Sequence, residues 1–234
     1  MSYKVLYIAL VSLLAGSAMA QDCTFFFPQK EGTQLIRRGY DAKGNLRNVM
    51  ISKVDKVTTL PEGTEVEADF VYTDAAGNEI SKGELECSCQ NGEFYMDMKD
   101  VVSFPTALSL INSDVVITSD FMNYPNTFSD TMDEGGNYYF DDANIKLYNK
   151  NNKKERANVS IYNRQFVKNE KIKTPAGDFD CAKVSYNVDI LTPKGRESGY
   201  GYEWYAPNLG VVRSEMYDKE NDLQSYTVLE MITE

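Results

Sequence analysis

Apolar and polar residues alternate along several stretches of this chain, a pattern typical of β-strands with one buried and one solvent-facing side. From residue 183 to 190 the even positions are apolar and the odd positions polar. Apolar residues also occupy the even positions from 66 to 72, with acidic residues between most of them. A helix would distribute these apolar side chains around its circumference. Both stretches are therefore predicted to be amphipathic strands.

Turn sequences rich in Pro, Gly, Asn and Asp separate the predicted strands. Residues 192–195 (TPKG) predict a turn into a strand with two distinct faces. One face carries Tyr200, Tyr202 and Trp204, and the other carries Gly201, Glu203 and Tyr205. Residues 206–210 (APNLG) predict the next turn, before two further strands that end near residue 232. Similar hairpin tips, with Asp, Asn or Gly after an aromatic residue, recur near positions 41, 74, 149 and 218.

Hairpins laid side by side in sequence order predict an all-β fold. The expected architecture is a strongly curved antiparallel meander sheet or an open barrel of about ten strands, with one short helix at most. That helix candidate runs from about Phe104 to Ile111, with Ser103 as its N-cap. We expect residues 21–234 to form a single domain, and the alternative is two smaller sheets that divide near residues 120–140.

Three short phrases in the C-terminal part carry a family resemblance. They are TPAGDFDC at 174–181, WYAP at 204–207 and GVVR at 210–213. The stretch 170–232 resembles the C-terminal part of the TapB-like family, β-rich cell-envelope proteins of Bacteroidetes grouped under a domain of unknown function. The resemblance implies an all-β fold and a cell-envelope location. The family brings no established catalytic residues to transfer.

The N-terminus has the order of a secretory signal peptide. Lys4 precedes an apolar run from Val5 to about Gly16, and Ala18-Met19-Ala20 supplies the small residues of a cleavage site. The apolar run is too short to span a membrane. We therefore expect residues 1–20 to be removed and the mature chain, with no transmembrane segment, to be exported to the periplasm or cell surface of a Gram-negative bacterium. Gln21 and Asp22 directly precede Cys23, where a lipoprotein signal needs small apolar residues. Lipid attachment at Cys23 is therefore not the favoured interpretation.

All four cysteines lie in the part of the chain that we expect to be exported, where disulfides are favoured. They are Cys23, Cys87, Cys89 and Cys181. A bond between Cys87 and Cys89 would join side chains on the same face of one strand, about 6.5–7 Å apart, at or beyond the usual limit. The two remaining connectivities both pair Cys23 and Cys181 with Cys87 and Cys89. A metal site or redox pair is the less favoured alternative, because the spacing is Cys-x-Cys and no histidine is present.

Composition excludes several functions. The net charge is −11 and no basic block occurs, which argues against nucleic-acid binding and against docking on anionic lipid. The absence of histidine excludes Ser-His and Cys-His nucleophile pairs and His-liganded zinc. Without a Gly-rich phosphate loop, no cofactor is expected. Carboxylates are plentiful, so a paired-carboxylate hydrolase stays open, although no two of them are distinguished by the sequence.

Five carboxylates gather around Gly135-Gly136 in the least regular part of the chain. They are Asp130, Asp133, Glu134, Asp141 and Asp142. Calcium prefers several carboxylate oxygens, so these residues form a candidate calcium site. Their spacing matches no EF-hand loop, and a solvated acidic loop is the preferred interpretation.

The aromatic stripe of Tyr200, Tyr202 and Trp204 is the candidate binding surface, for an envelope glycan, lipid or protein. Ordinary core packing is the competing interpretation of the same residues. The favoured function is a non-catalytic binding or accessory module of the cell envelope. The alternatives are a carboxylate-based hydrolase that acts on envelope polymers and a structural subunit of an envelope complex.

Overall fold

The computed structural model describes residues 23–61, 63–90, 93–97, 114–124 and 142–234. Within these residues the chain forms thirteen strands and no helix, and all thirteen belong to one antiparallel sheet. The strands are β1 (Gln34–Asp41), β2 (Leu46–Leu60), β3 (Gly63–Asp74), β4 (Glu79–Gln90), β5 (Glu93–Asp97), β6 (Val115–Ser119), β7 (Phe121–Tyr124), β8 (Ala143–Asn149), β9 (Glu155–Thr174), β10 (Gly177–Thr192), β11 (Gly195–Ala206), β12 (Gly210–Asp218) and β13 (Leu223–Thr233). The expected all-β antiparallel fold is confirmed.

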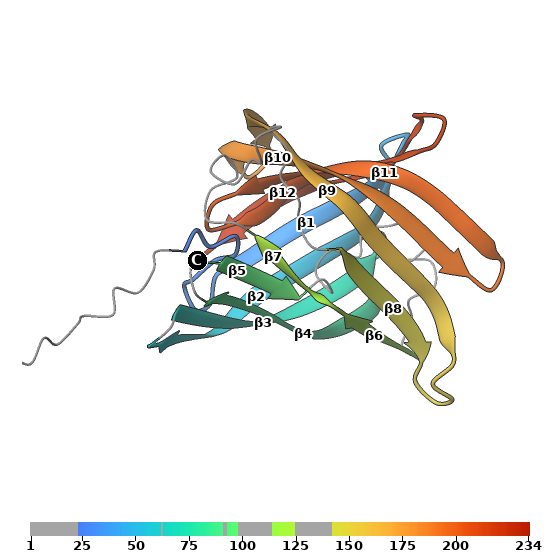
Figure 1. Ribbon diagram of the computed structural model, residues 1–234. Helices are drawn as coiled ribbons and strands as arrows, with labels where there is room; N and C mark the ends of the chain where they lie inside the picture. Colours follow the sequence, from blue (N-terminus) through green and yellow to red (C-terminus); the bar gives the residue numbers. More distant parts are fainter. Residues whose placement is uncertain (1–22, 62, 91–92, 98–113, 125–141) are drawn as a thin grey trace, which may run out of the picture.

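The sheet curls until its two edges nearly meet (Figure 1). Its order is β6-β8-β9-β10-β11-β12-β13-β1-β2-β3-β4-β5-β7, so the first and last strands of the chain pair in the middle of the sheet. The edge strands β6 and β7 are separated in sequence only by Asp120, yet β6 pairs with β8 and β7 with β5. The result is a nearly closed barrel with one unsealed seam, and the alternative of two separate sheets is wrong.

The predicted apolar faces form the barrel core. Val184, Tyr186, Val188 and Ile190 are each at most 2% exposed. The apolar side chains at positions 66, 68, 70 and 72 are buried in the same cluster. Complete burial of one large apolar side chain contributes roughly 1.5–3 kcal/mol. The alternation in the sequence therefore reports directly which side of each strand faces inward.

Three predicted hairpin tips are closed by the same aspartate turn. The carboxylate accepts hydrogen bonds from the backbone N–H groups two and four residues further on, at 2.8–3.0 Å. The aspartates are Asp41, Asp74 and Asp218, and Asn149 forms a looser version with its amide oxygen. Hydrogen bonds from the side chains of Asn45 and Asn78, together with these backbone bonds, lower the pKa of Asp41 and Asp74.

Residues directly after Cys23 fill one end of the barrel. Phe25, Phe26 and Phe27 are buried, and the rings of Phe25 and Phe94 lie 4.8 Å apart. On the other side, Phe26 packs edge-on against Tyr205, and the backbone N–H of residue 208 donates to the carbonyl of residue 25 at 2.7 Å. The segment thus touches both the β4–β5 and the β11–β12 ends of the sheet. Three consecutive phenylalanines show no strand or helix periodicity, so the local sequence pattern does not predict this role.

One disulfide anchors the same segment. Cys23 is bonded to Cys89 with a Cα separation of 6.1 Å, while Cys87 and Cys181 are buried as thiols. Only one of the two expected bonds is therefore formed. The strands that carry Cys87 and Cys181 are β4 and β10, which are not neighbours in the sheet. Burial raises the pKa of the Cys181 thiol to about 12, which suppresses thiolate chemistry there.

Two sequence predictions concern residues outside the described part of the chain: the signal peptide at 1–20 and the short helix at about 104–111. In the described ranges, no helical segment has the length and hydropathy that a bilayer crossing requires.

Acid stability is expected to depend on Asp189 of β10. Its carboxylate accepts hydrogen bonds from Arg196 and Ser198, and the Arg196 bond is the main reason why its pKa is lowered to about 2. Because the unfolded chain has the higher pKa, near 3.9, this contribution is present above about pH 4 and lost as the pH falls towards about 2. Between pH 5 and 2, the temperature of thermal unfolding should fall less steeply with pH in Asp189→Asn than in the wild type. Equal slopes for the two proteins would contradict this assignment.

Candidate functional site

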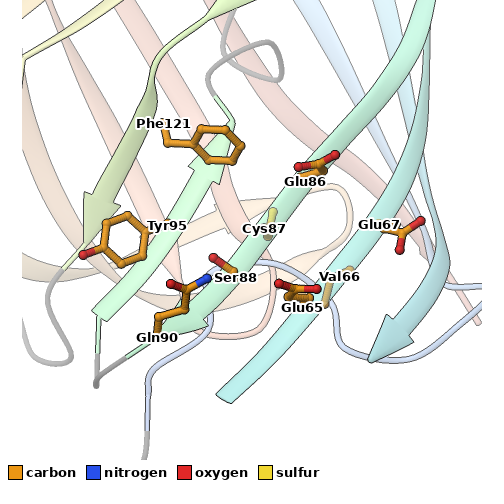
Figure 2. A pocket seen from close by; sticks show the side chains of 9 residues that line it. All are labelled: Glu65, Val66, Glu67, Glu86, Cys87, Ser88, Gln90, Tyr95 and Phe121. Atoms are coloured by element: carbon orange, nitrogen blue, oxygen red, sulfur yellow. The ribbon is translucent and has the colours of Figure 1, made fainter. Parts of the chain in front are cut away.

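A pocket of about 410 Å³ opens on the outer side of the sheet, over β3, β4, β5 and β7 (Figure 2). Its lining residues are Glu65, Val66, Glu67, Glu86, Cys87, Ser88, Gln90, Tyr95 and Phe121. Val66 and Cys87 belong to the core, whereas their acidic neighbours in sequence are solvent-facing. The volume is within the range typical of small-ligand sites.

The strand register arranges these side chains in rows across the sheet. Glu67 of β3 lies directly opposite Glu86 of β4. In the next row, Ser88 lies opposite Glu65 on one side and Tyr95 on the other. The carboxylates thus gather on the β3 and β4 side of the pocket, and the rings of Tyr95 and Phe121 on the β5 and β7 side (Figure 2). The site combines an acidic wall with an aromatic wall.

The acidic wall is electrostatically costly. Like charges directly opposite each other in a sheet destabilise it, and Glu67 and Glu86 form such a pair. Lys56 of β2 lies 2.8 Å from the Glu67 carboxylate and offsets part of this repulsion. A positively charged group in the pocket would offset more of it.

The aromatic wall stays accessible. Phe121 is 49% exposed, one of the large apolar side chains that the described chain leaves on its surface. Tyr95 is half-buried, and its hydroxyl donates a 2.6 Å hydrogen bond to Glu93, which fixes the ring at the pocket edge. Phe121 differs from the other exposed apolar side chains because it lines a pocket beside polar groups, the combination found in small-ligand sites.

The predicted stripe of Tyr200, Tyr202 and Trp204 lies elsewhere, on the outer face of β11. Trp204 is only 4% exposed: Lys183 covers its ring at 4.7 Å, and its indole N–H donates to Glu170 at 2.7 Å. Tyr200 and Tyr202 remain partly exposed. None of the three lines the pocket, so the structure separates the stripe from the cavity.

A charged cluster occupies the barrel interior at β9 and β11. An irregularity in the pairing of β9 with β10, where Asn163 has a φ of 52°, turns Arg164 inward until it is 0% exposed. Arg164 donates to the Tyr205 hydroxyl at 3.1 Å, and Tyr205 donates to the buried carboxylate of Glu203. Burial raises the pKa of Glu203, and the nearby guanidinium opposes that shift. The cluster is enclosed by the core and is interpreted as structural.

Most of the candidate calcium site lies outside the described residues. Asp130, Asp133, Glu134 and Asp141 fall in the range 125–141, and Asp142 is exposed directly before β8. Across the parts of the chain that the structure does describe, no group of three or more His, Cys, Asp or Glu side chains is arranged to hold a metal ion.

Two solved structures share this fold and much of the sequence. A protein of Parabacteroides distasonis, described as a candidate lipoprotein, is 55% identical, with a TM-score of 0.85 over 91% of this chain and 100% of its own. A protein of Bacteroides fragilis, described as a candidate exported protein with a YmcC-like fold, is 48% identical, with a TM-score of 0.86 over the same shares. The comparison with curated proteins finds no match.

The family comparison identifies one family over most of the chain. The DUF3108-like model matches residues 30–229. The TapB-like name is not confirmed, whereas the coarser implication, a relationship to exported β-proteins of Bacteroidetes, agrees with both solved structures. The chain belongs to the DUF3108-like family.

Proposed function

We propose that this protein is a non-catalytic binding module of the bacterial cell envelope, and that it holds its partner in the acidic and aromatic pocket on β3, β4, β5 and β7. The exported or lipoprotein descriptions of its relatives support the location. So does the predicted signal peptide at residues 1–20. The single sheet formed by all the described strands supports one mature domain from residue 21 to 234.

The observation that carries the proposal is the exposed Phe121 ring beside a preformed polar pocket. Every lining side chain belongs to a strand of the sheet, so paired backbones hold the site in position. Binding sites on rigid elements lose little conformational entropy when a ligand binds.

A carboxylate-based hydrolase is the second candidate, because Glu67 and Glu86 face each other across two strands. Directly opposite residues have Cβ atoms about 4.5–5.5 Å apart, so the two flexible side chains can bring their carboxyl groups to the separation of about 5–5.5 Å that retaining glycosidases use. Both side chains are exposed, however, and Glu67 is paired with Lys56. A catalytic acid needs apolar surroundings that raise its pKa. The geometry therefore favours binding over catalysis.

Native mass spectrometry of the mature protein, isolated from the envelope of its own bacterium, tests the binding function. We expect a bound mass that disappears on denaturation, and Phe121→Ser should remove it. Leu191→Ser is the matched control, since Leu191 is 52% exposed and lies outside the pocket. A bare protein mass, or a bound mass that both variants retain, would contradict the proposed site. Hydrolysis of envelope polymers that Glu86→Gln abolishes would establish the second candidate instead.

A further inference from the structure

We infer that the pocket takes a positively charged segment of a partner protein, with a Lys or Arg side chain seated between the glutamates and the two rings. This inference rests on the proposed binding function and specifies the chemistry of the ligand.

The pocket carries a net negative charge. Glu65, Glu67 and Glu86 contribute three carboxylates, and the ion pair with Lys56 offsets one of them. A second cation in contact with these carboxylates is attracted to them, more strongly near the protein surface than in bulk water. It would also relieve the repulsion between the facing Glu67 and Glu86. The pocket is thus complementary to a cation.

The aromatic wall suits the side chain of a Lys or Arg residue. Arg and Lys side chains bind over aromatic faces, and their alkyl stems cover apolar surface while the charged head reaches polar groups. This protein already uses that arrangement elsewhere, since the Lys183 ammonium lies 3.9 Å from the centre of the Tyr202 ring. In the pocket, Tyr95 and Phe121 would contact the stem while the carboxylates opposite receive the charge. Ser88 and Gln90 between the walls can hydrogen-bond to a peptide backbone.

The charge of the pocket favours a basic protein segment over the other envelope ligands. Anionic lipid headgroups and acidic glycans would be repelled by the carboxylates, and an unpaired like charge counts strongly against a ligand. A neutral glycan would leave the repulsion between the glutamates unrelieved. Lys and Arg side chains, in contrast, are fully charged at neutral pH. A basic protein segment can place its charge against the carboxylates of the acidic wall and its alkyl stem against the rings of the aromatic wall.

Selection from a phage-displayed library of random twelve-residue peptides tests this inference on the disulfide-bonded mature protein. We expect the enriched peptides to be rich in Lys or Arg. In fluorescence-polarisation titrations, the triple variant Glu65→Gln, Glu67→Gln and Glu86→Gln should bind an enriched peptide at least about tenfold more weakly. The control variant Asp69→Asn with Glu84→Gln alters a facing acidic pair on the same two strands, outside the pocket, and should change the affinity less than about twofold.

Several results would overturn the inference. One is the enrichment of peptides without basic residues. Another is an equal loss of peptide affinity in the triple variant and in its control, because that result would indicate attraction to the overall negative charge of the protein. A library with no peptide that prefers the wild type to the triple variant would also overturn it. In each case the Phe121-dependent bound mass in native mass spectrometry decides separately whether the proposed binding function stands. All substitutions lie on the outer face, so unchanged thermal unfolding confirms that each variant is folded.

Discussion

Arg164→Ala is expected to lower the free energy of unfolding by about 3–5 kcal/mol, because it leaves the Glu203 carboxylate buried without its cationic partner. The guanidinium lies 3.9 Å from that carboxylate and also donates to the Tyr205 hydroxyl. The substitution therefore removes a charge, a hydrogen bond and a large packed side chain together. Urea unfolding, followed by intrinsic fluorescence, measures the change.

The double variant Arg164→Met with Glu203→Gln is the control for this prediction. It removes both charges while it keeps similar side-chain volume, so it should recover much of the stability lost in Arg164→Ala. If Arg164→Ala lowered the free energy of unfolding by less than about 1 kcal/mol, the buried carboxylate of Glu203 would not depend on Arg164 and the prediction would be wrong. An equal loss in the single and double variants would assign the effect to packing rather than to the unpaired charge.

Removal of the disulfide by Cys23→Ser with Cys89→Ser is expected to cost about 4 kcal/mol, since the bond closes a loop of 66 residues. The bond restrains the unfolded chain, and in the folded state it anchors the phenylalanines that fill the end of the barrel. Reduction of the wild type with dithiothreitol should give the same loss of stability.

Cys181→Ala is the matched control, because Cys181 is a buried thiol that forms no disulfide. This variant should remain as sensitive to dithiothreitol as the wild type, whereas the double serine variant should no longer respond. If reduction left the stability of the wild type unchanged, the structural role assigned to the Cys23–Cys89 bond would be wrong.

Much of the fold could be predicted from local sequence patterns. The alternation at 66–72 and 183–190 identified two strands and their buried faces, since a strand exposes successive side chains to opposite sides. The turn sequences at 41, 74 and 218 identified hairpins, since the aspartate that closes each one accepts hydrogen bonds from backbone N–H groups two and four residues further along the chain. Both signals depend on neighbours in sequence.

Features that depend on distant contacts could not be predicted in this way. The pairing of β1 with β13 and the position of the seam depend on which strands meet when the sheet curls. The pocket depends on register: Glu67 was expected on the solvent-facing side of its strand, but the sequence does not show that it lies opposite Glu86. Arg164 was missed because one irregular position in β9 reverses the face that alternation would assign to it.

The measurement that tests the binding site most directly is a map of backbone amide shifts by NMR, recorded while the detergent-solubilised envelope of its own bacterium is added to the labelled mature protein. The account predicts that the largest changes occur at Glu65 to Glu67, at Glu86 to Gln90 and at Tyr95 and Phe121, the strands that line the pocket. Changes confined to the Tyr200 and Tyr202 surface of β11, or no changes at all, would contradict it.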